Sequence, residues 1–152
     1  MRSMHSSEKI EELVAELEAY RLDAILLSET WRHEPAKIWE TQHNPIFMGA
    51  GRYKNKHGVG IMLNKRWKKR IIDTDYINER AIKTTILVNR QLIELMSVYF
   101  PHSKYADHHV EKMYRNIEKH MTNNKKCIPI IGGDFNAELG PGKGTECKSV
   151  GK

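Results

Sequence analysis

Four polar residues of types that bind metal ions and phosphate stand at the ends of short apolar runs. They are Glu29, Tyr99, Asp134 and Asn136. Magnesium prefers hard carboxylate oxygens, keeps several waters and takes a substrate phosphate as a further ligand, a role that suits Glu29 and Asp134. The Asn136 amide and the Tyr99 hydroxyl can donate hydrogen bonds to phosphate oxygens. Because layered α/β folds assemble their sites at strand ends, the four positions are candidates for one site.

Each of these residues also has a simpler structural interpretation. Glu29 can be a solvated loop acid, Tyr99 a packed strand aromatic, and Gly132-Gly133 a plain turn into Asp134. For any residue taken alone, the simpler interpretation is favoured.

The segments between these residues predict a mixed α/β domain. Apolar residues on one helical face predict an amphipathic helix over 8–20, and the apolar run 23–27 predicts a buried strand after it. A second amphipathic helix, with its apolar face between 110 and 121, precedes a strand over 128–131. Because Pro129 cannot donate a backbone hydrogen bond, we expect it at the start of this strand or on an edge strand. An antiparallel meander is predicted from strands over 59–63, 67–72, 82–88 and 92–99.

The composition favours one soluble, intracellular domain over residues 1–152. Hydrophobic residues make up 39% of the chain, and no apolar run approaches the roughly 20 residues that a membrane helix needs. Cys127 and Cys147 fit neither a disulfide framework nor a thiolate metal site, so no disulfide partner is expected. The formal charge of +6 would attract a polyanion, but unless a site points the same way, a solvated basic surface is the favoured explanation.

Three motifs together resemble the endonuclease/exonuclease/phosphatase superfamily. In the family's order and broad spacing, they are Leu27-Ser28-Glu29-Thr30-Trp31, Val98-Tyr99-Phe100-Pro101 and Gly132-Gly133-Asp134-Phe135-Asn136-Ala137. The segments Gly58-Val59-Gly60-Ile61 and Glu79-Arg80 add to the likeness, which covers nearly the whole chain. It is closest to the endonuclease domains of non-LTR retrotransposons and to craniofacial development protein 2-like sequences. The Gly-Asp-Phe-Asn core is its specific part.

The resemblance implies a four-layered α/β sandwich, in which helices flank two mixed sheets and the active site lies at one end. It implies that Glu29 binds Mg²⁺, with Mn²⁺ as a substitute, and that Tyr99 steadies the phosphate. Asp134 would handle the proton of the attacking water or the leaving oxygen, and Asn136 would donate to the phosphate. The implied reaction is in-line attack of water on a phosphodiester, with DNA as the expected partner and the nucleus as the expected setting.

Basic residues in two places are further candidates for DNA contact. Arg32, Arg52 and Lys54 lie in loops near the expected site and would meet substrate phosphates, although loops are commonly basic for solubility. The cluster over 64–70 can touch the DNA backbone or act as a nuclear import signal. An exposed strand edge protected by Lys and Arg explains this cluster equally well.

The chain also departs from the family pattern. Family members begin with a strand that carries an Asn at the metal site and end with a Ser-Asp-His segment, and neither has a match here. We therefore expect a domain truncated at both ends, with weak activity by itself. Two alternatives stay open: a non-catalytic remnant that binds nucleic acid, and a phosphatase of the same superfamily that acts on a phosphoinositide or sphingolipid.

Overall fold

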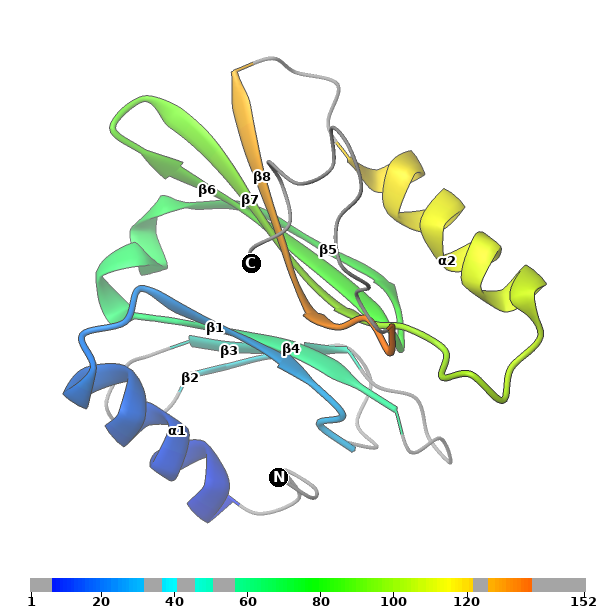
Figure 1. Cartoon of the computed structure of the whole chain (residues 1–152). Helices are drawn as coiled ribbons and strands as arrows, with labels where there is room; N and C mark the ends of the chain where they lie inside the picture. Colours follow the sequence, from blue (N-terminus) through cyan, green and yellow to red (C-terminus); the bar gives the residue numbers. More distant parts are fainter. Residues whose placement is uncertain (1–6, 32–36, 41–45, 51–56, 122–125, 138–152) are drawn as a thin grey trace, which may run out of the picture.

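A computed structural model describes residues 7–31, 37–40, 46–50, 57–121 and 126–137 as a four-layered sandwich (Figure 1). Two four-stranded sheets face each other, and one helix covers the outer face of each sheet. This arrangement confirms the predicted α/β class with two sheets between helices. No helix in these ranges is long and apolar enough to cross a membrane.

The first sheet is antiparallel and carries the N-terminal helix α1 (Ser7–Ala19). Val14 and Leu17 of this helix pack against Met62, as the amphipathic pattern predicts. Two strands of this sheet, β2 and β3, have no counterpart among the predicted elements. The strand order is β1 (Ala24–Ser28), β4 (Val59–Leu63), β3 (Ile46–Ala50) and β2 (Lys37–Glu40).

The second sheet combines an antiparallel meander with one parallel strand. Helix α2 (Asp107–His120) connects β7 to β8 and packs Met113 and Ile117 against Phe100 on the outer face of the sheet. Pro129 lies in the edge strand β8, as its missing N–H predicts. The strand order is β5 (Ile71–Asn78), β6 (Ala81–Val88), β7 (Gln91–Tyr99) and β8 (Cys127–Asp134).

The predicted strand over 67–72 is wrong for 67–70 and right for its last two residues, which begin β5. Residues Lys65–Arg70 form a 3-10 helix, η1, whose first turn is capped by the Asn64 side chain, which accepts a hydrogen bond from the Arg66 backbone N–H at 3.2 Å. Trp67 then packs on the core and donates its indole N–H to Asp23 at 2.5 Å. The basic cluster is therefore a helical connection between the sheets and not a strand edge. Strand β4, predicted as part of the meander, pairs instead in the first sheet.

The inner faces of the two sheets form one core and leave polar groups at one end. Ile61 and Ile82 are fully buried between the sheets, and Tyr99 lies in the same cluster with 6% of its surface exposed. The Ser97 hydroxyl crosses the gap and donates to the Leu27 carbonyl at 2.7 Å. This contact brings the ends of β1 and β7 together, so the polar residue that follows each strand reaches the same place.

Candidate active site

Glu29 and Tyr99 come from opposite sheets and meet through a hydrogen bond. Glu29 directly follows β1, where a left-handed backbone (φ 52°) turns the chain, and Tyr99 is the last residue of β7. The Tyr99 hydroxyl donates to Glu29 Oε1 at 2.7 Å. The two residues were predicted to belong to one site, and the structure brings their side chains into contact across the two sheets.

Asp134 joins this pair through the register of the parallel strands. Tyr99 of β7 is aligned with Asp134 of β8, and residues aligned in this way point to the same face of a sheet. Asp134 Oδ1 accepts the backbone N–H of Asn136 at 2.8 Å. The Asn136 side-chain nitrogen donates one of its two hydrogens to the Phe100 carbonyl at 2.8 Å. The second amide hydrogen is left to bind a ligand.

Two glycines allow β8 to reach this position. A Cβ on Gly132 would lie 2.8 Å from the Leu26 Cδ1 atom of the facing sheet. Gly133 has φ +135°, and a Cβ there would lie 2.0 Å from the Val98 carbonyl oxygen. The Gly-Gly pair therefore serves close packing of the backbone, and it is more than a plain turn into Asp134.

Arg80 and His57 complete the cluster. The Arg80 guanidinium lies over the Tyr99 ring, 5.0 Å from its centroid, and donates to the Tyr99 carbonyl at 3.3 Å. Its second amino group is 3.0 Å from His57 Nε2, which therefore accepts, and His57 Nδ1 carries the proton. Nδ1 is buried and has no hydrogen-bond partner among the described residues. The sequence analysis assigned neither residue a role, although Arg80 belongs to a family-like segment and His57 directly precedes another.

Burial sets the protonation states in this cluster. Burial, followed by the hydrogen bond to Glu29, raises the pKa of Tyr99 to about 12. Burial, followed by the positive charge of Arg80, lowers the pKa of His57. At neutral pH Tyr99 is therefore a hydrogen-bond donor, His57 is uncharged, and Arg80 is the cation beside the two carboxylates.

The donor set is compatible with one hard divalent cation. Glu29 is half-buried, and its Oε2 atom makes no hydrogen bond within the described residues. The same residues contain no group of three His, Cys, Asp or Glu side chains that could enclose a metal. Magnesium commonly uses one or two carboxylates and fills its other positions with water and substrate oxygens, so Glu29 with Asp134 nearby fits it.

The three loop cations proposed for substrate binding are not tested by this geometry. Arg32, Arg52 and Lys54 lie outside the described residues.

Comparisons with known proteins agree with the fold. The model of the Endonuclease/Exonuclease/phosphatase family matches residues 2–147. The crystal structure of D. rerio TDP2, humanized by 14 mutations, is similar with a TM-score of 0.60, 17% identity and coverage of 87% of this chain. An endonuclease/exonuclease/phosphatase family protein from Leptotrichia buccalis is similar with a TM-score of 0.61, 19% identity and 88% coverage. The chain spans 60% and 63% of these two proteins. No curated protein sequence matches it.

Proposed function

Because the chain belongs to the endonuclease/exonuclease/phosphatase family, we propose that it hydrolyses phosphodiester bonds, with magnesium as cofactor and DNA as substrate. One observation carries the proposal: the Tyr99 hydroxyl holds the Glu29 carboxylate at the end of the sandwich where Asp134 also ends its strand. A purely structural role gives no reason for two carboxylates and a half-buried arginine to share this end of the sandwich, since like charges repel.

Glu29 is the residue that would hold the metal. Divalent ions are in general use in this family, and the described residues supply the oxygen ligands that Mg²⁺ or Mn²⁺ prefers. When bound, the ion would neutralise negative charge on the phosphate. The Tyr99 hydroxyl fixes the orientation of the Glu29 carboxylate through their hydrogen bond. Hydrogen bonds of this kind commonly orient the side chains that bind a metal ion.

The substrate phosphate would be held by donors around this carboxylate. Asn136 has one amide hydrogen to donate, because the other bonds to the Phe100 carbonyl. Arg80 supplies positive charge and is itself positioned by Tyr99 and His57. Fixed donors of this kind stabilise the charge that builds up during hydrolysis without having to reorganise.

Asp134 would handle the proton. Its Oδ1 atom is engaged by the Asn136 backbone, which fixes the carboxylate plane, while its Oδ2 atom makes no hydrogen bond among the described residues. A carboxylate held in this way can accept the proton of an attacking water or return one to the leaving oxygen. General acid–base help of this type contributes roughly 10²–10⁴-fold to a rate.

The biological setting is part of the proposal. The basic charge of the chain and the likeness of its motifs to retrotransposon endonuclease domains support nicking of DNA, with the nucleus as the setting. The activity is proposed for the whole protein, because the chain spans 60% and 63% of the two similar structures. A chain extended by a first strand with an Asn and by a Ser-Asp-His segment is expected to nick faster than the 152 residues by themselves.

Titration of Mg²⁺ into the 152-residue chain tests the metal site directly. Glu29→Gln should weaken Mg²⁺ binding at least tenfold, because a neutral amide replaces the charged ligand. Glu16→Gln is the control, since Glu16 is an exposed acid of α1. Equal affinities in the wild type and Glu29→Gln would remove Glu29 from the site.

Nicking of supercoiled plasmid by the extended chain tests the reaction. Release of phosphate from a phosphoinositide, without nicking, would instead support the lipid phosphatase. DNA binding with neither activity would support the non-catalytic remnant.

A further inference from the structure

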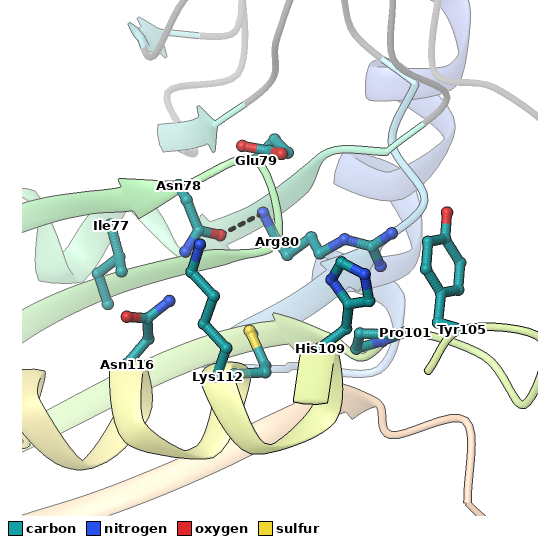
Figure 2. Close-up of a pocket in the computed structure, with 10 residues that line it drawn as sticks. Ile77, Asn78, Glu79, Arg80, Pro101, Tyr105, His109, Lys112 and Asn116 are labelled. Atoms are coloured by element: carbon teal, nitrogen blue, oxygen red, sulfur yellow. Dashed lines mark hydrogen bonds between the residues drawn. The ribbon is translucent and has the colours of Figure 1, made fainter. Parts of the chain in front are cut away.

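A pocket of about 410 Å³ lies between helix α2 and the turn that joins β5 to β6 (Figure 2). His109, Lys112 and Asn116 line it from the helix, and Asn78 and Arg80 line it from the turn. Its volume is within the range of about 300–1,000 Å³ that is typical of small-ligand sites. None of the roles proposed above uses its helix side.

Arg80 connects this pocket to the proposed active site. Its guanidinium carbon lies 5.0 Å from the centroid of the Tyr99 ring and 5.3 Å from that of Tyr105. In Figure 2 the Arg80 side chain extends along the pocket toward Tyr105. Tyr99 in turn bonds to Glu29, so a polymer bound at the carboxylate can continue into the pocket.

The pocket has an excess of positive charge. Arg80 and Lys112 are its permanent cations, and Glu79 is its one acid. Within the described residues, neither cation forms an ion pair with a carboxylate. Figure 2 shows the Lys112 side chain extending from α2 toward Asn78, while the Glu79 carboxylate lies across the turn from the helix. An anion that enters from the solvent would therefore meet two cations that form no ion pair with a carboxylate of the described residues.

Aromatic and amide groups accompany these cations. The Tyr105 ring makes edge contacts with the rings of His102 and His109, at centroid distances of 4.6 and 5.7 Å. Asn78 Oδ1 accepts the backbone N–H of Arg80 at 2.7 Å, which leaves the Asn78 amide nitrogen to donate. Cations beside an aromatic ring are the combination that binds the phosphate and the base of single nucleotides.

We propose that this pocket binds a nucleotide that flanks the cleaved phosphodiester of a DNA strand. Lys112 and Arg80 take its phosphate, and Tyr105 stacks on its base. The inference rests on the proposed function, because it assigns the second contact of the same substrate. It places part of the DNA footprint on helix α2, which carries none of the family-like motifs.

Binding of a fluorescein-labelled DNA duplex, measured by anisotropy in EDTA over a series of salt concentrations, tests the pocket without cutting. Lys112→Gln should weaken binding and lower the slope of log Kd against log salt by about 0.9, the value for one phosphate contact. Lys119→Gln is the matched control, because Lys119 is exposed on the same helix and does not line the pocket. Tyr105→Ala should weaken binding about tenfold, as loss of one stacked base does, and Tyr105→Phe should not.

The outcomes separate this inference from the proposed function. If Lys112→Gln and Lys119→Gln have the same affinity and salt slope, the pocket is not a DNA contact, while the Mg²⁺ titration of Glu29→Gln is unaffected. A wild-type chain that binds no duplex overturns the inference. The inference is also overturned if the chain binds vesicles that contain phosphatidylinositol bisphosphate, if this binding depends on Lys112, and if the chain does not bind DNA. Thermal unfolding of each variant checks that the fold is intact.

Discussion

Replacing Tyr99 with phenylalanine removes one oxygen atom from the contact between the two sheets. In the wild type, the hydroxyl donates to Glu29 Oε1 at 2.7 Å, and Tyr99 is 6% exposed. A hydrogen bond to a charged acceptor contributes roughly 1.5–3 kcal/mol, and the ring packing is kept in the variant. We expect Tyr99→Phe to lower the free energy of unfolding by about this amount at pH 7. For a chain of this length the melting temperature should then fall by roughly 3–12 °C.

The same substitution should change how stability depends on alkaline pH. The pKa of Tyr99 is raised from 10.0 to about 12 in the folded chain. As the pH rises above 10, the unfolded chain loses this proton first, so the contribution is complete below pH 10 and is lost as the pH rises through about 12. Two pKa units correspond to roughly 3 kcal/mol. The difference in stability between wild type and Tyr99→Phe should therefore shrink over this range.

Denaturant unfolding between pH 7 and pH 12 measures both effects, and Mg²⁺ titration adds a third. Because Tyr99 orients Glu29, its loss should weaken Mg²⁺ binding roughly 10- to 100-fold. Tyr114→Phe is the control, since Tyr114 is 56% exposed on α2. If Tyr99→Phe and Tyr114→Phe behave alike in stability and in Mg²⁺ affinity, the bond between Tyr99 and Glu29 does not organise the site.

Three further predictions follow from the same region. Gly133→Ala should destabilise the fold by at least about 3 kcal/mol in denaturant unfolding, because its φ is +135° and the Val98 carbonyl blocks a Cβ; Gly132→Ala should cost less, since a flexible side chain faces it. The lowered pKa of His57 predicts that stability falls as the pH drops below 6.5, where the unfolded chain binds the proton first, and His57→Gln should reduce that fall. Asp134→Asn should abolish plasmid nicking by the extended chain while leaving its stability at pH 7 nearly unchanged; full nicking would remove Asp134 from the mechanism.

Local patterns were sufficient to predict the helices and to place Glu29 and Asp134 at the ends of strands. The apolar faces of 8–20 and 110–121 repeat with the helical period and become the buried faces of α1 and α2. Glu29, Tyr99 and Asp134 were recognised because each ends an apolar run within a motif, and strand ends gather in α/β folds. The roles assigned to these residues stay predictions, as does the contact of Arg32, Arg52 and Lys54 with the substrate.

Only the tertiary structure decided which strands pair with each other. The run Val59–Leu63 is apolar throughout, and an apolar run of this kind fits either sheet; its pairing with β1 and β3 depends on contacts far apart in sequence. The segment 67–72 alternates less clearly. Packing of the partly buried Trp67, together with the Asn64 cap, stabilises the 3-10 helix η1 where the first four residues of the predicted strand would lie.

At the site, the cluster of His57, Arg80 and Tyr99 was likewise not predictable from local sequence patterns. These residues are separated by 23 and 19 positions and belong to different connections, so no local period relates them. They meet because Gly58 donates its backbone N–H to the Glu79 carbonyl and Tyr99 donates its own to the Arg80 carbonyl. The positions of the two candidate carboxylates at strand ends were therefore predictable, whereas the position of the Arg80 cation was set by how two loops pack on the end of the sandwich.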